Sequence, residues 1–284
     1  MSLNLWKEPP QESKPKKHYS KILPLKEGQT ATEQFGWLPI SIFRPGKGAG
    51  WEDAVRDDGD ISSRRGKNAK YLPGLRFSKF NAHLAEIVIR YWSMPGDLVV
   101  DPFAGRATRG VVALRLGRRY QEYEIAPTTF KKTKTQISDL GGKLEFSDGC
   151  VLGHTHHNKA DLIFTCPPYW RLERYESTKD QLSDLQDYST FLSRISECAR
   201  NCYRVLRPGR FCCWVCADWR LGKGLTLFHA DSLKVFRKAG FSLHDIVIVE
   251  NLSPFAALQT GKVAAKRYTS KVHEYLLVFR KEKS

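Results

Sequence analysis

Apolar and polar positions alternate along the chain from about residue 71, and they predict helices and strands in turn. In residues 80–92 the apolar side chains recur at helical spacing on one face: Leu84, Ile87, Val88 and Tyr91. Short apolar runs between such segments read as buried strands. The pattern predicts strands at 98–100, 120–125, 144–146, 161–165, 211–216, 242–249 and 272–279, and helices at 80–92, 107–117, 127–139, 187–206 and 227–239.

Strands that alternate with helices predict an α/β fold, in which helices cover both faces of a mainly parallel sheet. The last two predicted strands have no room for a crossover helix between them, so the sheet should finish with an antiparallel pair. Residues 1–70 differ, because they are rich in Lys, Pro, Gly and Asp. We therefore predict a basic, partly mobile extension at 1–70, in which 37–43 is apolar enough to pack on a core, and a main domain at 71–284.

The charge of the chain points to a polyanionic partner. Its 284 residues include 46 Lys and Arg but only 30 Asp and Glu, which gives a formal net charge of +16. Each phosphate that a basic side chain neutralises releases counterions, so this excess favours nucleic acid. A solubilising surface would give the same balance. The basic run at 62–67 is the first candidate contact for DNA.

Neither a membrane nor the secretory pathway is indicated. No apolar run reaches the roughly 18 residues of a membrane span, and residues 1–20 lack the apolar core of a signal peptide. The seven cysteines form no even framework of the kind that small secreted proteins use. We interpret them as reduced, mostly buried thiols of a cytoplasmic protein.

Residues 99–110 (VVDPFAGRATRG) run from a strand through a glycine-containing turn into a helix. In a doubly wound sheet, a nucleotide-like ligand binds between such a strand end and helix N-terminus. Asp101 at the strand tip could receive a cationic amino group, and Glu124 ends the next strand, where an acid binds ribose hydroxyls. No Lys follows the second glycine, which argues against a phosphate-binding P-loop. Alone, the loop would fit a tight turn in any α/β protein equally well.

A second loop, residues 165–170 (TCPPYW), also follows an apolar strand. Its two prolines fix the direction of the Pro167 carbonyl and donate no hydrogen bond themselves, so this carbonyl is available as an acceptor. Tyr169 offers a flat ring on which a nucleic-acid base could stack. The alternative is a rigid turn whose aromatic side chains belong to the core.

Together the two loops resemble those of the DNA amino-methyltransferases, which modify adenine N6 or cytosine N4. Residues 101–105 (DPFAG) resemble motif I of this family, and 166–169 (CPPY) resemble motif IV. Further resemblances are those of residues 77–80 to motif X, Glu124 to motif II, Asp148 to motif III and 207–210 to the turn before the fifth strand. The likeness covers about 75–284, with 36–58 more loosely, and is nearest to phage- and prophage-borne methylases.

The resemblance implies a fold, a cofactor and partners. The fold would be the Rossmann-like, seven-stranded sheet of methyltransferases, with helices on both faces and one antiparallel strand. S-adenosyl-L-methionine would be the methyl donor and S-adenosyl-L-homocysteine the product, with no metal required. Double-stranded DNA would be the substrate, in a prokaryotic or phage-infected cell. A restriction endonuclease is left open as a partner, and the oligomeric state is not indicated.

The resemblance also implies a set of site residues. The catalytic residues would be Cys166, Pro167, Pro168 and Tyr169. The cofactor would be bound by Phe77, Ser78, Asp101, Pro102, Phe103, Gly105, Thr108, Glu124, Asp148 and Gly149. DNA recognition is expected in 1–70, in the loop after Trp170 and in 251–269, with contacts at Arg64, Arg65, Lys67, Trp170, Arg171, Lys262, Lys266 and Arg267.

Two residues depart from the family pattern. Ala107 replaces a common glycine, which predicts a stiffer cofactor loop. Cys166 replaces the usual Asp, Asn or Ser. Because a thiol is a weak hydrogen-bond acceptor, the Pro167 carbonyl should be the main acceptor for the amino group of the base. Cys166 is closest in size to Ser, which hints at cytosine N4, whereas adenine N6 is the commoner activity of the family. The choice between the two bases stays open.

Three rival functions are considered beside this one. Methylation at cytosine C5 would need Cys166 as a nucleophile, but that family has Pro before Cys, and here Cys comes first. RNA or a protein glutamine could be the substrate, since similar Pro-Pro-Tyr loops occur in those enzymes. A catalytically inactive nucleic-acid-binding protein that keeps the fold would bind the cofactor without transferring the methyl group.

The histidines at 154, 156 and 157 lie close to Cys150 in the sequence and invite a zinc hypothesis. Their spacing does not match the usual finger patterns, and histidines in loops are mostly solvated, so we predict no metal site. Cys198 and Cys202 are one helical turn apart and are interpreted as thiols of the core.

Overall fold

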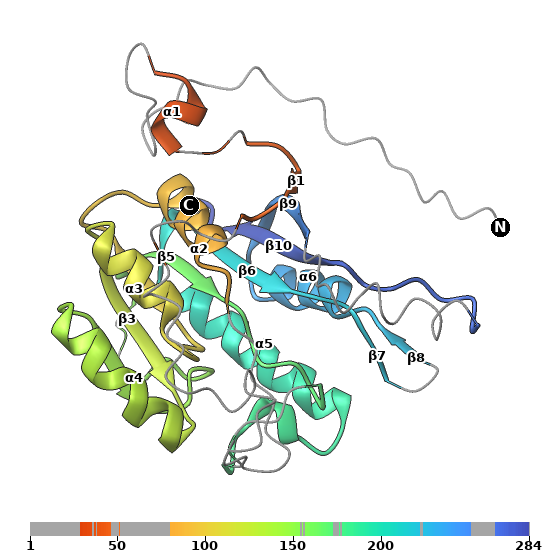
Figure 1. The fold of residues 1–284 in the computed structure, drawn as a ribbon. Coiled ribbons are helices and arrows are strands. Elements are labelled where there is room, and N and C mark those ends of the chain that lie inside the picture. The colour runs from red at the N-terminus through yellow and green to blue at the C-terminus, as the bar shows by residue number, and fades with distance from the viewer. Residues whose placement is uncertain are drawn as a thin grey trace, which may run out of the picture.

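An eight-stranded sheet forms the centre of the computed structural model, which describes residues 29–35, 37, 39–46, 51, 80–153, 155, 157–172, 176, 178–221, 224–250 and 265–283. The strands lie in the order β1-β9-β10-β6-β5-β2-β3-β4 (Figure 1). β10 is antiparallel to both of its neighbours, and the other neighbouring strands are parallel. The α/β class and the antiparallel finish are therefore confirmed.

The bounds of most elements follow the hydrophobic pattern closely, but β6 begins at Leu206, so residues 207–210, predicted as a turn, belong to the strand. The strands are β1 (Ile42–Phe43), β2 (Leu98–Asp101), β3 (Arg119–Glu124), β4 (Lys143–Phe146), β5 (Ala160–Thr165), β6 (Leu206–Cys216), β7 (Trp219–Leu221), β8 (Gly224–Thr226), β9 (Ser242–Glu250) and β10 (His273–Arg280). The helices are α1 (Ala31–Phe35), α2 (Ala82–Trp92), α3 (Thr108–Arg115), α4 (Pro127–Asp139), α5 (Tyr188–Val205) and α6 (Phe228–Lys238). None of these described helices has both the length and the apolar character needed to cross a membrane.

The sheet has one strand more than the seven that were predicted. The extra strand is β1, which pairs in parallel with β9 through Ile42 opposite Ile248 and Phe43 opposite Val249. Phe43 and Trp37 are buried in the same core cluster as α2. The apolar stretch at 37–43 therefore packs on the core as predicted, but two residues are too short a strand to be recognised from alternation.

Helices cover both faces of the sheet, as predicted (Figure 1). α2, α3 and part of α4 enclose one core cluster, and α5 and α6 enclose the other. Neighbouring strand residues point to opposite faces, so Val99 belongs to the first cluster and Val100 to the second. This two-sided burial explains why the central strands read as continuous apolar runs.

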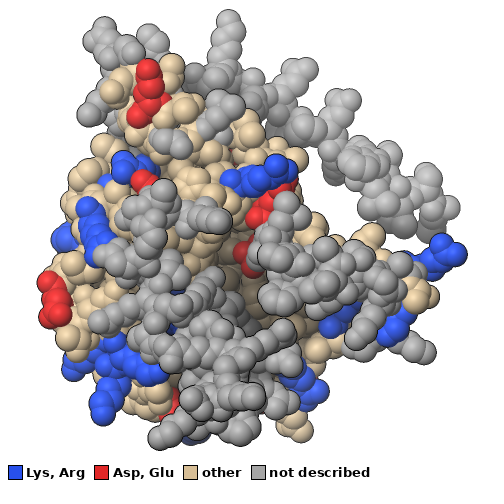
Figure 2. Space-filling model, in the orientation of Figure 1, with Lys and Arg blue, Asp and Glu red and all other residues tan. Residues whose placement is uncertain are grey.

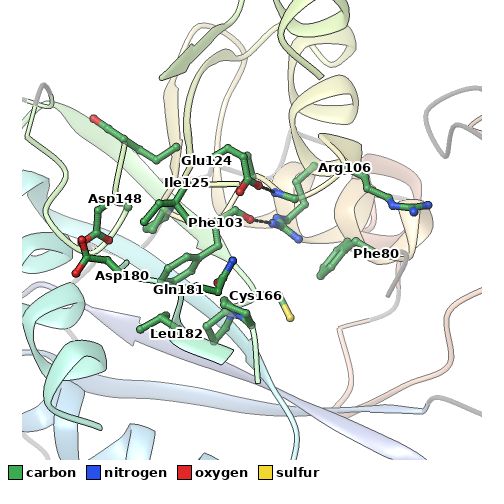
Figure 3. A pocket seen from close by; sticks show the side chains of 18 of the residues that line it. Phe80, Phe103, Arg106, Glu124, Ile125, Asp148, Cys166, Asp180, Gln181 and Leu182 are labelled. Carbon is green, nitrogen blue, oxygen red and sulfur yellow. Dashed lines mark hydrogen bonds between the residues drawn. The ribbon is translucent and has the colours of Figure 1, made fainter. Parts of the chain in front are cut away.

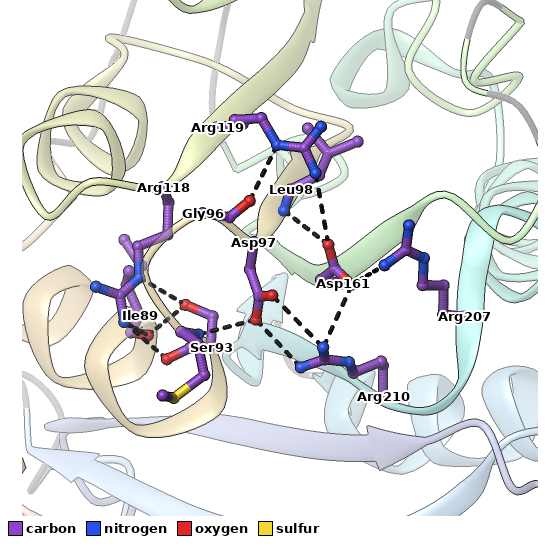
Figure 4. Close-up of polar contacts among 11 residues, drawn as sticks. Ile89, Ser93, Gly96, Asp97, Leu98, Arg118, Arg119, Asp161, Arg207 and Arg210 are labelled. Atoms are coloured by element: carbon purple, nitrogen blue, oxygen red, sulfur yellow. Dashed lines mark hydrogen bonds and ion pairs between the residues drawn. The ribbon is translucent and has the colours of Figure 1, made fainter. Parts of the chain in front are cut away.

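A network of charged side chains ties the amino ends of the central strands together (Figure 4). The buried Asp161 carboxylate accepts from the Leu98 backbone N–H at 2.9 Å and pairs with Arg207 at 2.8 Å. Arg210 bridges the same carboxylate, at 3.5 Å, and that of Asp97, at 3.1 Å. These bonds fix the ends of β2, β5 and β6, and the opposite, carboxyl edge of the sheet is left for the loops described next.

Candidate functional site

A cavity of about 810 Å³, part of which is open to solvent, lies at the carboxyl ends of β2, β3 and β5. Both loops singled out from the sequence line it (Figure 3). Its walls are Phe80, Pro102, Phe103, Ala104, Gly105, Arg106, Thr108, Arg109, Tyr123, Glu124, Ile125, Asp148, Gly149, Cys166, Pro167, Pro168, Asp180, Gln181 and Leu182. The cavity thus combines apolar walls with a few acidic and basic groups, as sites for small organic ligands do.

The first loop turns sharply between β2 and α3. Gly105 has φ +55° and Ala107 has φ +60°, so both lie in the left-handed region. A left-handed conformation costs a residue with a Cβ about 1–2 kcal/mol. Ala107 is also fully buried. The turn therefore holds Ala107 in a conformation that favours glycine, at the position where the family commonly has one.

Asp101 lies beneath the cavity and does not line it. Its carboxylate is buried and accepts four hydrogen bonds from three neighbouring elements and its own loop. The donors are the Arg109 guanidinium at 2.7 Å, the Tyr120 hydroxyl at 2.7 Å, the Thr165 hydroxyl at 2.6 Å and the Phe103 backbone N–H at 3.0 Å. Through these bonds the carboxylate joins the first loop to β3 and to β5, the strand that precedes the second loop.

Arg109, which the sequence interpretation missed, connects Asp101 to the cavity. Its guanidinium donates to Asp101 and to the Phe103 carbonyl, and it lies 4.6 Å from the centre of the Phe80 ring. Burial alone would lower the pKa of Arg109, but the charge and hydrogen bond of Asp101, together with other neighbouring groups, outweigh it, so the pKa is raised and the side chain stays charged. Burial also raises the pKa of the neighbouring Glu122 carboxyl well above its usual range.

Glu124 ends β3 with its side chain at the cavity. One carboxylate oxygen accepts from the Gly105 N–H at 3.1 Å and the other from the Ala126 N–H at 2.7 Å. Burial raises the pKa of Glu124 to about 7, although these backbone bonds oppose the rise. An acid held in this way can change its charge near neutral pH and can accept further hydrogen bonds when ionised.

The residues after β4 close the other side of the cavity. Asp148 accepts from the Cys150 N–H at 2.9 Å and pairs with Arg194 of α5. At Gly149 the backbone touches the first loop, because a Cβ placed there would lie 1.7 Å from the Pro102 carbonyl oxygen. A glycine is therefore required for this approach, and it brings residues 148–149 against residues 102–103.

The second loop begins directly after Thr165. Cys166, Pro167 and Pro168 line the cavity, and among the described residues no donor is bonded to the Pro167 carbonyl. The Cys166 sulfur lies 3.8 Å from the Tyr169 hydroxyl. Tyr169 is not among the residues that line the cavity, and its side chain is buried. It packs against Trp219 and Phe228, so its role as a stacking surface stays a prediction.

Most of the expected cofactor residues come together in the cavity. Pro102, Phe103, Gly105, Thr108, Glu124, Asp148 and Gly149 all line it, whereas Phe77 and Ser78 lie outside the described residues. Ile125 also lines the cavity, and its position directly after Glu124 could have revealed it. Residues 180–182 also line the cavity, from a loop distant in the sequence that the two motifs did not indicate.

The expected DNA contacts are only partly described. Arg64, Arg65, Lys67 and Lys262 lie outside the described residues, whereas Lys266 and Arg267 are exposed. Arg171 is exposed and lies 4.8 Å above the Trp170 ring, whose N–H donates to the Leu185 carbonyl at 2.8 Å. Figure 2 shows Lys and Arg side chains spread over one face, with Asp and Glu side chains beside its central hollow. Whether the basic side chains contact DNA stays a prediction.

No grouping of three or more metal-binding side chains occurs within the described ranges. His154 and His156 lie outside them. Cys150 is buried, and Cys198 and Cys202 are buried with their sulfurs 3.9 Å apart. The interpretation of Cys198 and Cys202 as thiols of the core is therefore confirmed.

Comparison with known proteins adds a family and a fold. The family model described as DNA methylase (N6/N4 type) matches residues 2–135 and 160–284. The Type II methyltransferase M.Cfr9I of Citrobacter freundii is 36% identical over 83 residues. That match spans 27% of this chain and 27% of the relative, so it concerns about a quarter of either protein.

Two solved structures resemble the fold more broadly. The [4+2]-cyclase SpnF has a TM-score of 0.51 and 15% identity over 72% of this chain and 82% of its own. A geranyl diphosphate methyltransferase, solved with its substrate and sinefungin, has a TM-score of 0.51 and 13% identity over 71% of this chain and 77% of its own. At this identity the likeness concerns the fold alone, and a cyclase among the neighbours means that the fold does not fix the chemistry.

Proposed function

The chain belongs to the DNA methylase family of the N6/N4 type, and on that basis we propose that it transfers a methyl group from S-adenosyl-L-methionine to an exocyclic amino group of a base in double-stranded DNA. The observation that carries this proposal is that the cofactor loop and the Cys166-Pro167-Pro168 loop line one cavity. The base would be adenine or cytosine. The name of the Citrobacter relative also makes a restriction endonuclease a candidate partner.

The residues of the cavity fit a nucleoside cofactor. Phe103 and Ile125 offer apolar walls for a purine, and the Glu124 carboxylate stands where ribose hydroxyls would donate to it. The missing side chain at Gly149 lets the backbone after Asp148 approach Pro102 closely, and this contact shapes one side of the cavity. Thr108 begins α3, so the backbone of this helix N-terminus also faces the cavity. We propose that these residues hold the cofactor and that Asp101 acts beneath it.

An exocyclic amino nitrogen is a poor nucleophile, because its lone pair is delocalised into the ring of the base. The Pro167 carbonyl, with no described donor bonded to it, would accept a hydrogen bond from the amino group and so localise that lone pair. Cys166 would accept the second proton more weakly. When bound, S-adenosylmethionine supplies an electrophilic methyl group. The chain contributes by positioning the amino group of the base against the methyl group. To reach this position the base must leave the DNA helix, at a cost of a few kcal/mol.

The test is to incubate the protein with DNA and cofactor labelled in the methyl group, and to identify modified nucleosides by mass spectrometry. N6-methyladenine or N4-methylcytosine supports the proposal and chooses between the two bases. 5-Methylcytosine, or label in RNA or in a protein glutamine offered in parallel, would replace it with a rival function. Cofactor binding without transfer to any of these substrates would identify an inactive relative.

Cys166→Ser should remain active, because the cysteine is proposed to assist by a weak hydrogen bond and not to attack carbon. DNA that contains 5-fluorocytosine should therefore form no stable adduct with the wild-type protein, as judged by denaturing gel electrophoresis. An adduct that disappears in Cys166→Ser would show a nucleophilic cysteine, and the amino-group assignment would then be withdrawn.

Cofactor affinity should rise with pH through the pKa of Glu124. Burial raises this pKa to about 7, and ribose hydroxyls donate to the ionised form, so binding releases a proton. The affinity should increase about tenfold from about pH 6 to about pH 8, measured by calorimetry. Glu124→Gln cannot ionise and should bind weakly with no such dependence. An unchanged pH profile in Glu124→Gln would mean that another group titrates.

Without cofactor, the raised pKa of Glu124 should make the folded protein less stable as the pH rises. Between pH 4.5, the ordinary pKa of a glutamate, and about pH 7, the folded state keeps a proton that the unfolded state has released. The free energy of unfolding should therefore fall as the pH rises through this range, and the cofactor should offset the loss.

A further inference from the structure

The β7–β8 hairpin is a feature that the proposed function does not yet use. It follows β6 directly and extends away from α3 and α4 (Figure 1). Its two strands pair with each other and with no strand of the main sheet: Trp219 lies opposite Thr226, and Arg220 lies opposite Leu225. Residues directly opposite share a face, so Trp219 and Thr226 lie on one face and Arg220 and Leu225 on the other.

The first face is fixed to the second loop of the site. Trp219 is buried, and its ring centre lies 5.5 Å from that of Tyr169 and 5.4 Å from that of Phe228. Tyr169 comes directly after the prolines that line the cavity. The hairpin is therefore held in a defined position beside the place where a base would enter.

The second face is basic and aromatic. The Arg220 guanidinium lies 4.0 Å from the centre of the Tyr268 ring, which joins the hairpin to residues 265–271. The described residues of 219–227 and 265–271 include four Lys and Arg residues and no Asp or Glu: Arg220, Lys266, Arg267 and Lys271. A surface of this charge complements a row of phosphates.

Exposed leucines gather on the same hairpin. Three of the ten large apolar side chains that are exposed in the described part of the chain lie on this hairpin or directly after it, with exposed fractions of 36% for Leu221, 38% for Leu225 and 46% for Leu227. Apolar side chains exposed among basic ones are typical of proteins that insert a wedge between base pairs. Such a wedge would suit a protein that must take a base out of the stack.

We propose that the β7–β8 hairpin, with residues 265–271, is a docking surface for duplex DNA. Arg220 contacts a phosphate, and the leucines press against the base pairs beside the flipped base. The wedge rests on the proposed methyl transfer, whereas the phosphate contact requires only DNA binding. The two parts can therefore be tested separately.

The phosphate contact is tested with Arg220→Gln and a labelled duplex of random sequence. The affinity should fall, and the slope of log affinity against log salt should lose about 0.9, as expected for one phosphate contact. Arg200→Gln is the control, because Arg200 is an exposed arginine in the second half of α5. If Arg220→Gln matches the wild type in affinity and slope, the docking surface is wrong, whether or not the protein methylates DNA.

The wedge is tested with Leu225→Ser. Leu140→Ser, at 37% exposure just after α4, is a control of nearly equal exposure. On duplex that contains the sequence methylated by the wild type, single-turnover methyl transfer should slow about tenfold in Leu225→Ser and hardly at all in Leu140→Ser. A mismatch at the target base should restore most of the rate, because a mismatched base is easier to extrude. Equal rates in Leu225→Ser and the wild type, or a loss that the mismatch does not relieve, would overturn the wedge.

Discussion

Replacing Gly149 with alanine is expected to abolish cofactor binding while leaving the protein folded. The added Cβ would lie 1.7 Å from the Pro102 carbonyl oxygen and 2.6 Å from its carbonyl carbon. Backbone cannot give way as a flexible side chain does, so residues 102–103 or 148–149 must move. All four residues line the cavity, and its shape would change. Overpacking of this kind costs about 1–3 kcal/mol, which a folded domain survives.

Gly153→Ala is the matched control for this variant. Gly153 follows in the same connection between β4 and β5, but a Cβ there would meet nothing within 4 Å. S-adenosylmethionine should raise the melting temperature of Gly153→Ala as it raises that of the wild type, and should leave Gly149→Ala unchanged. If Gly149→Ala keeps the wild-type shift, the approach of the two loops does not shape the cofactor site.

Most strands of the main sheet could be predicted, because the apolar residues in their sequence are also the residues that are buried in the structure. β5 is buried along its whole length, and its centre, residues 162–164, is a continuous apolar run. β1 could not be found in this way, since its two residues gain their strand character from pairing with β9. The β7–β8 hairpin was also missed, although Gly-Lys between Leu221 and Gly224 is a signal for a two-residue hairpin turn.

Those parts of the site that consist of one contiguous segment could be predicted from the sequence. The turn after β2 and the Pro-Pro loop are contiguous motifs at strand ends, and both line the cavity. The surroundings of Asp101 could not be foreseen, because its partners come from α3, β3 and β5. The burial of the Tyr169 ring likewise depends on Trp219 and Phe228, which are distant in the sequence.

Asp101→Ala should therefore lower stability as well as cofactor binding. The substitution leaves the Arg109 charge buried without its partner, which typically costs about 3–5 kcal/mol. The Tyr120 and Thr165 hydroxyls also lose their acceptor. For a protein of this size, such a loss should lower the melting temperature by roughly 10 °C. Thermal unfolding without cofactor measures the first effect, and calorimetric titration with cofactor measures the second.

A double variant separates the structural role of Asp101 from its role in the site. Asp101→Ala with Arg109→Leu removes the unpaired charge along with the carboxylate, so most of the lost stability should return. Cofactor affinity should stay low, because nothing then holds the Phe103 N–H or the Thr165 hydroxyl in place. If affinity returns together with stability, Asp101 serves only to neutralise Arg109. If Asp101→Ala alone is as stable as the wild type, the buried carboxylate does not join the two loops, and their alignment must come from packing.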